Sequence, residues 1–233
     1  MVESTLSTSP RYIATVKNSR EIILFGTADL QFWTRKLKPE NLSPAERDGQ
    51  SQVMIAAVES RWLGVRFCEF LVAVLTETNQ KQGAMPSYYL VAAYNTSRAF
   101  TFIEQRYFQT PYQHAEIEVH LTSHHSEIKL RRRSAELILA SQQLPGTAPP
   151  VSTDWEGVIY LPPRYPNVSK LFYARMGGLT QIRPFQSGQD QLHLTPTPTD
   201  PVMGWLLESQ FAGFEWHTRN AATHSRSETF DRD

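Results

Sequence analysis

The sequence predicts an α+β fold that is mostly β, with a strongly curved or closed antiparallel sheet and two or three peripheral helices. Many short runs rich in Val, Ile, Tyr, Phe and Thr are separated by turn-forming residues, which is typical of strands. Few stretches show helical spacing of apolar residues. The chain has no repeat of fixed period, and 233 residues suit one large domain.

The N-terminal third is predicted to contain strands and one helix. "RYIATVKNSREIILFGT" reads as two short strands around the turn-prone pair Asn18-Ser19. Leu30, Trp33 and Leu37 then recur at helical spacing, and Pro39 ends that run. The apolar runs "VMIAAVES", "FCEFLVAVLTE" and "YYLVAAYN" follow, and their composition predicts three further strands.

The middle of the chain is predicted to hold a second helix and another group of strands. "TSRAFTFIEQRYF" reads as a short helix capped by Thr96 or Ser97, and Pro111 cannot continue it. Residues 113–121 alternate polar and apolar side chains, as a strand does. "SHHSEIKLRRRSAELILAS" indicates one or two more strands before a proline-rich connection.

The last part of the chain alternates short strands with turns and contains the clearest helix. "WEGVIYLPP", "KLFYARMGG", "LTQIRPFQ" and "QLHLTPTPTD" are the predicted strands. Asp200 is the expected N-cap of a helix with Pro201 at its first position, and "GFEWHTR" predicts a last strand. We therefore expect a single domain over residues 10–219, with flexible polar termini at 1–9 and 220–233.

Composition argues against several classes of partner. Lys plus Arg and Asp plus Glu both number 23, so net charge gives no reason to expect nucleic acid or an anionic membrane. No apolar run approaches the length of a membrane helix, and the N-terminus lacks the pattern of a secretory signal. Cys68 is the single cysteine, which suits a reducing compartment. We expect a cytoplasmic protein without a cofactor.

Three short motifs, in order along residues 10–125, resemble the acetoacetate decarboxylase-like superfamily. "NSREIILFGTADLQFWTRKLKPENL" is similar to that family's Asn-Arg-Glu strand, helix and Pro-Glu-x-Leu loop. "SRWLGVRFCEF" is similar to its Gly-x-Tyr-x-Glu strand, with Glu69 one residue further from Gly64 than the family pattern has it. "FIEQRYFQTPYQHAEI" is similar to its Gly-Arg-Glu and Pro-Lys-Lys segment. The resemblance implies a curved β-cone or barrel with a central cavity.

The departures from the family pattern bear on chemistry. The family's first lysine after the proline forms a Schiff base with a β-keto acid, and the second lowers its pKa. Tyr112 and Gln113 occupy those two positions here, and neither side chain forms an imine. Six lysines remain in the chain, and Lys129, on a predicted strand, is the alternative site for a migrated Schiff base.

Two matched positions are candidates for substrate contact and proton transfer. The resemblance implies that Arg20 offers a guanidinium to a substrate carboxylate, a geometry that suits a bidentate fork. Pairing of Arg20 with a nearby surface acid is the alternative. Glu69 has apolar neighbours in sequence, so burial would raise its pKa unless it is paired. It is a candidate general acid or base, or half of a structural Arg–Glu pair.

The alternating stretch "HAEIEVHL" allows three interpretations. The plainest is a strand with one wet face, carrying His114, Glu116, Glu118 and His120, and one core face. If the polar face instead lines a cavity, His114 and Glu116, close to Tyr112, become candidate proton-transfer groups. The third interpretation is a metal site formed by these His and Glu side chains. Neighbours on one strand face lie about 6–7 Å apart, which is too far for an adjacent pair to chelate one ion without other strands. We therefore expect no metal.

These observations favour a divergent enzyme over a non-catalytic protein. The enzyme would act on a small or medium organic acid, keto acid or ketone without imine formation, as a decarboxylase, dehydratase, cyclase or isomerase of a specialised pathway. Glu69, Tyr112, His114 and Glu116 are the catalytic candidates, with Arg20 and Gln113 binding the substrate. The alternative is a binding protein that kept the family cavity, and association with identical subunits stays open.

Overall fold

The computed structural model describes residues 10–77, 85–143, 149–163 and 169–232. Within these ranges the chain forms three α-helices, in agreement with the two or three predicted, and two β-sheets where the sequence predicted one. The strands of the larger sheet are β1 (Tyr12–Asp29), β2 (Glu46–Arg47), β3 (Gln50–Trp62), β4 (Val65–Thr76), β5 (Ser87–Asn95), β6 (Tyr112–His114), β10 (Val151–Leu161), β11 (Lys170–Pro184) and β13 (Ala212–Asp231). The smaller sheet contains β7 (Glu116–Leu121), β8 (His125–Arg132), β9 (Ala135–Gln143) and β12 (Gln191–Leu194).

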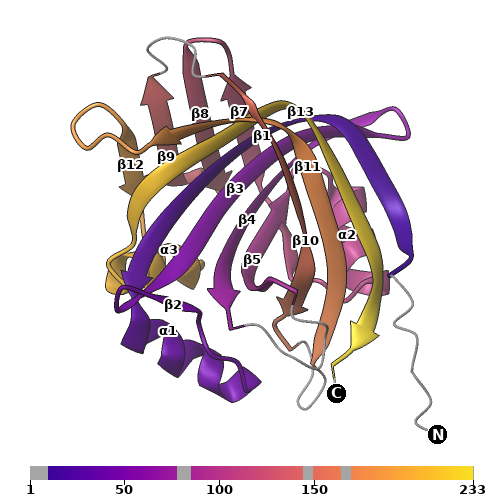
Figure 1. The fold of residues 1–233 in the computed structure, drawn as a ribbon. Coiled ribbons are helices and arrows are strands. Elements are labelled where there is room, and N and C mark those ends of the chain that lie inside the picture. The colour runs from indigo at the N-terminus through magenta and orange to yellow at the C-terminus, as the bar shows by residue number, and fades with distance from the viewer. Residues whose placement is uncertain (1–9, 78–84, 144–148, 164–168, 233) are drawn as a thin grey trace, which may run out of the picture.

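Seven strands of the larger sheet curve into a near-ring. Their order is β1-β13-β11-β10-β5-β4-β3, and β1 also pairs with β3, which brings the two ends together. Figure 1 shows these long strands wrapping around a common interior. Most pairs are antiparallel, but β10 joins β5 in parallel through only three residue pairs, Val158–Tyr160 with Ser87–Tyr89. The predicted curved sheet is therefore confirmed, as a mixed near-ring rather than a strict barrel.

The hydrophobic core lies between the outside of the ring and the smaller sheet. Ile22 and Leu24 on β1 point to this side, where they share one cluster with Ile117, Ile128 and Leu130 of the smaller sheet. The neighbouring residues Ile23 on β1, and Met54 and Ala56 on β3, point to the inside of the ring. Because both faces of these strands are covered, their sequences are almost continuously apolar.

All three predicted helices are present, and two of them begin at the N-caps that the sequence predicts. Helix α1 (Leu30–Leu37) begins after Asp29, whose side chain accepts a hydrogen bond from the backbone N–H of Phe32. Helix α2 (Arg98–Tyr107) has Ser97 as its N-cap, and α3 (Pro201–Glu208) has Asp200. A short 3₁₀ turn, η1 (Lys38–Glu40), follows α1 at the proline. Among the described residues no helix is long and apolar enough to span a membrane.

Two expectations about the chain's ends need correction. The segment 12–29 is one strand and not two. Asn18, where a turn was expected, takes a positive φ of 58° and forms a bulge, and β1 continues through it. Residues 220–231 are not a flexible tail. They belong to β13, which pairs with β1 on one side and β11 on the other. Residues 1–9 lie outside the described ranges.

Candidate functional site

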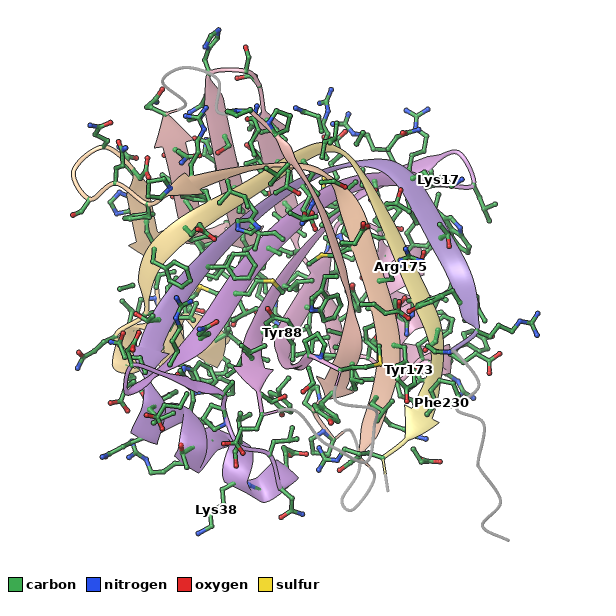
Figure 2. The ribbon with its side chains drawn as sticks, in the orientation of Figure 1. Lys17, Lys38, Tyr88, Tyr173, Arg175 and Phe230 are labelled. Carbon is green, nitrogen blue, oxygen red and sulfur yellow. The ribbon has the colours of Figure 1, made fainter. Side chains whose placement is uncertain are left out.

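The inside of the ring encloses a cavity of about 270 Å³. Most of its wall is apolar, and aromatic rings reach it from β3, β4, β5, β6, β10 and β11 and from the region of α2. These rings belong to Trp62, Phe67, Tyr88, Phe100, Phe108, Tyr112, Trp155 and Phe172. In Figure 2, Tyr88 on β5 and Arg175 on β11 mark two sides of the ring interior. A cavity of this kind suits an apolar ligand that is smaller than most drugs and carries few polar groups.

Glu69 is the carboxylic acid on the cavity wall with the most strongly altered acidity. It lies on β4 between Val58 of β3 and Asn95 of β5, and the Asn95 side-chain amide donates a 3.0 Å hydrogen bond to its Oε1. Burial, reinforced by the negative charge of Glu104, raises the pKa of Glu69 to about 7. Hydrogen bonds from Tyr112 and Asn95 and the charge of Arg226 oppose this rise. Glu69 is therefore able to gain and lose a proton near neutral pH.

Tyr112 is the direct partner of Glu69 on the cavity wall. Its strand, β6, is only three residues long and pairs in parallel with β5, which brings residue 112 beside Ala93. The side-chain amide of Gln105 donates a hydrogen bond to the Tyr112 carbonyl and holds this short segment to α2. Burial and the nearby charge of Glu69 raise the pKa of Tyr112 well above its ordinary value. Tyr112 therefore stays protonated and acts as a hydrogen-bond donor.

A largely buried ion pair stands next to this acid. Both oxygens of Glu104 on α2 accept hydrogen bonds from Nη1 of Arg226 on β13, at 2.7 and 2.6 Å, and Thr110 donates a further bond to Glu104. The Arg226 guanidinium also lies over the rings of Phe108 and Phe172, 4.3 and 4.5 Å from their centroids. The guanidinium next to Glu69 is thus already neutralised by a carboxylate, whereas the other guanidinium on the wall, Arg175, lies exposed on β11.

No lysine lines the cavity in the part of the chain that the structure describes. Lys17 and Lys38 lie at the outer margin of the molecule in Figure 2 and are solvent-exposed. Lys129 lies on β8 of the smaller sheet, where its Nζ is 2.8 Å from Oε1 of Glu127, and this hydrogen bond raises its pKa. An imine-forming lysine requires the opposite shift. Lys81 falls outside the described residues.

Arg20 does not occupy the cavity. In β1 the side chains of Ala14 and Val16 point inward, and strict alternation would continue to residue 20. The bulge at Asn18 shifts the inward–outward alternation of side chains by one residue, so that Glu21 and Ile23 line the cavity and Arg20 faces outward. Arg20 is exposed and lies in a separate groove with residues of β4 and β7. The expected contact between Arg20 and a ligand in this cavity therefore has no support in the geometry.

The alternating stretch, expected as one strand over residues 113–121, is divided between the two sheets: His114 ends β6, and Glu116–Leu121 form β7, which has one wet face. Ala115, Ile117 and Val119 are buried in the main core, whereas His114 and Glu116 are exposed and absent from the cavity wall. Gln113 is half-buried on β6 and also lies outside that wall. Of the six predicted site residues, the structure brings only Glu69 and Tyr112 together. In the described ranges, no group of three potential ligands is placed to hold a metal ion.

Sequence reasoning missed six polar residues of the cavity wall: Glu21, Glu104, Arg175, His224, Ser225 and Arg226. Glu104 was visible only as a departure from the family motif, and Glu21 was hidden by the bulge before it. His224 and Arg226 lie in the segment expected to be flexible. That segment, "NAATHSRSETF", has little apolar alternation because its inward face meets a polar part of the cavity. The threonines and serines were the one available strand signal.

Comparison with known proteins shows the fold. No protein-family model and no curated protein matches the sequence. Among solved structures, an acetoacetate decarboxylase-like enzyme from Sphingomonas wittichii is 13% identical with a TM-score of 0.61, covering 99% of this chain and 98% of that one. An acetoacetate decarboxylase from Legionella pneumophila is 12% identical with a TM-score of 0.65, covering 98% and 93%. The enduracididine biosynthesis enzyme MppR, solved with pyruvate, is 13% identical with a TM-score of 0.61, covering 97% and 92%.

Proposed function

We propose that this protein is an enzyme that moves a proton next to the carbonyl of a small or medium, largely apolar ketone or keto acid, without forming an imine. One observation carries the proposal: a carboxylic acid with a pKa of about 7, Glu69, stands at the polar end of an apolar cavity and is hydrogen-bonded to Tyr112. General acid–base catalysis works best when the pKa of the group lies near the working pH. The fold, shared with enzymes such as acetoacetate decarboxylase and MppR, agrees with a carbonyl substrate.

The proton transfer uses the two paired side chains in sequence. The Glu69 carboxylate removes a proton from the carbon next to the carbonyl, the C–H electron pair forms a C=C bond to the carbonyl carbon, and the π pair of the carbonyl moves to its oxygen to give an enolate. Once protonated, Glu69 is a weaker acceptor, so the Tyr112 hydroxyl turns its hydrogen bond to the enolate oxygen. Return of the proton to the same carbon gives exchange, and its return to the far carbon of a conjugated enolate completes an isomerisation. In a β-hydroxy ketone the enolate re-forms the carbonyl, a C=C bond forms between the α- and β-carbons, and the β-hydroxyl takes the proton from Glu69 and leaves as water, which completes a dehydration.

The charges around the cavity favour a neutral carbonyl group over a free carboxylate. The Arg226 guanidinium is already held by both oxygens of Glu104. Next to Glu69, a substrate carboxylate would therefore meet the negative charges of Glu104 and Glu69, and Arg226, the cation that acts on Glu69, is already paired. Arg175, the other guanidinium on the wall, lies exposed on β11. A ketone oxygen needs only a hydrogen-bond donor, which Tyr112 supplies. Ketones should therefore bind better than the anions of keto acids.

The proposal is tested by exchange of protons for deuterons. The protein is incubated in D₂O with 1-tetralone, phenylacetone or levulinate, and NMR follows loss of the signal of the hydrogens next to the carbonyl. We expect exchange with the ketones, reduced at least 10²-fold in Glu69→Gln, as is usual for loss of a general base. Glu116→Gln makes the same chemical change at an exposed position and should exchange like the wild type. Equal rates in the wild type and Glu69→Gln would refute the assignment.

The second candidate function is a non-catalytic binding protein. The predominance of aromatic and aliphatic side chains on the cavity wall favours it, because such a wall binds apolar molecules without chemistry. In that case calorimetry would detect saturable binding of a ketone, while deuterium exchange would stay at the rate of buffer alone. The two measurements on the same samples separate the functions.

A further inference from the structure

A second polar cluster lies on the cavity wall, apart from the Glu69 group. Glu21 on β1 is ion-paired with the buried Arg219 of β13, whose remaining nitrogens donate to Thr180 at 2.6 Å and Thr153 at 2.8 Å. His224, also on β13, has its Nε2 3.4 Å from Oε1 of Glu21. Glu21 and His224 line the cavity, whereas Arg219 stands behind them. This cluster has no part in the proton transfer proposed above.

The sheet register gives the separation of the two clusters. Glu21 pairs with Val58 of β3, and Val58 pairs with Glu69 of β4, so the three residues form one row across the sheet. All three line the same cavity. Neighbouring strands are about 4.8 Å apart, so the Cα atoms of Glu21 and Glu69 are about 10 Å apart. An apolar strip centred on Val58 separates two polar ends.

The arrangement around His224 orients its ring. Nε2 is buried and has no hydrogen-bond partner among the described residues, with the Glu21 carboxylate as its nearest charged neighbour. A proton on Nε2 is favoured there, because this nitrogen lies 3.4 Å from a carboxylate oxygen of Glu21, which Arg219 holds in place. The lone pair then sits on Nδ1, the other ring nitrogen of a side chain that lines the cavity. His224 is therefore set up to accept a hydrogen bond.

We propose that Glu21 and His224 form a second binding site in this cavity, which recognises a hydroxyl group of the same ligand. The inference rests on the proposed function and narrows its substrate class to hydroxyl-bearing, mostly apolar ketones. The carbonyl lies at Glu69 and Tyr112, and the hydroxyl donates to Nδ1 of His224 across the apolar strip. A carboxylate at this end would be repelled by Glu21, and an ether has no proton to donate.

The test uses three ligands that differ at one position of a rigid bicyclic ketone. These are 6-hydroxy-1-tetralone, 1-tetralone and 6-methoxy-1-tetralone, and calorimetry gives their affinities for the full-length protein. We expect the hydroxy compound to bind the wild type about tenfold more tightly than the other two, as one good hydrogen bond to a buried partner allows. In His224→Phe and His224→Leu this preference should fall to within about twofold.

The outcomes separate this inference from the proposed function. Glu69→Gln should lose exchange but keep the hydroxyl preference, because the two clusters are distinct. Absence of exchange with an intact, His224-dependent preference would refute the proposed function alone. No preference in the wild type, or an unchanged preference in the His224 variants, would overturn the present inference. If both variants fail to fold, ¹⁵N NMR of His224 decides it: the Nδ1 resonance should shift with the hydroxy compound and not with its methyl ether.

Discussion

Replacing Glu69 with Gln should change how the stability of the protein depends on pH. Glu69 holds its proton more tightly in the folded protein, with a pKa of about 7, than a carboxyl group of ordinary pKa 4.5 does. Such a group contributes fully to stability below about pH 4.5, and its contribution is lost as pH rises through about 7. The amide that replaces the carboxyl group in Glu69→Gln stays neutral throughout, so the variant lacks this loss.

The size of the effect follows from the two pKa values. The difference between 4.5 and about 7, at about 1.4 kcal/mol per pH unit, corresponds to about 3 kcal/mol of unfolding free energy. The stability of Glu69→Gln relative to the wild type should therefore rise by about 3 kcal/mol between pH 4.5 and pH 8. For a domain of this size that corresponds to roughly 6–12 °C in melting temperature.

The assay is urea unfolding at a series of pH values for the wild type, Glu69→Gln and Glu116→Gln. Glu116 is exposed, so its variant controls for the loss of one carboxylate from the chain. We expect the Glu116→Gln curve to run parallel to the wild type and the Glu69→Gln curve to diverge upward from it above pH 5. Parallel curves for all three proteins would show that Glu69 is not held protonated by burial, and the reasoning about the site would fail.

Four further predictions concern the charges near this acid, the lysines and strand β13. Glu104→Gln removes a negative charge and should lower the pKa of Glu69, whereas Arg226→Met removes a positive charge and should raise that pKa; the pH midpoint of deuterium exchange measures both shifts. Arg226→Met should also lower the free energy of unfolding by about 3–5 kcal/mol, because Glu104 is left largely buried and unpaired, and urea unfolding measures this loss. Borohydride with β-keto acids should give no covalent adduct by mass spectrometry, and an adduct on Lys129 would contradict the lysine argument. Deleting residues 220–233 should abolish cooperative unfolding in circular dichroism, because it removes half of β13 from between β1 and β11.

Local patterns predicted the elements whose signals are local. The first helix was indicated by the spacing of Leu30, Trp33 and Leu37, and the other two by the capping residues Ser97 and Asp200, and the structure confirms all three helices. The apolar runs of β3 and β4 predicted strands, because strand composition is also a local signal. These features depend on neighbours within about one turn or a few strand positions, so a single sequence contains the information.

Two features of the site could not be predicted: which side chains of a bulged strand face inward, and which residues far apart in sequence meet. One residue with positive φ, Asn18, decides whether Arg20 or Glu21 faces the cavity, and alternation alone does not show which residue forms a bulge. Strand β13 is held by pairing on both edges, so its polar sequence needs no apolar face to be ordered. Arg226 meets Glu104 across 122 positions of sequence, a contact that no local pattern indicates.

The ion pairs inside the ring also explain how the protein stays folded with several charged groups on its cavity wall. Arg219 and Arg226 each meet a carboxylate, Glu21 and Glu104 respectively, so these charges are compensated within the ring. Glu69 has hydrogen-bond donors but no cation of its own, and it meets the cost of burial by keeping its proton to a higher pH. The absence of a paired cation makes burial of the Glu69 carboxylate unfavourable, and it also suits Glu69 to the proton transfer proposed above.

The central claim is tested most directly by titrating the side chain of Glu69 itself. The protein is labelled with ¹³C at the glutamate side-chain carboxyl carbon, and Glu69→Gln identifies the resonance by its absence. We expect the chemical shift of this carbon to titrate with a midpoint near pH 7. A midpoint between pH 4 and 5, the range of an ordinary glutamate, would contradict the account of the cavity as a site for acid–base chemistry.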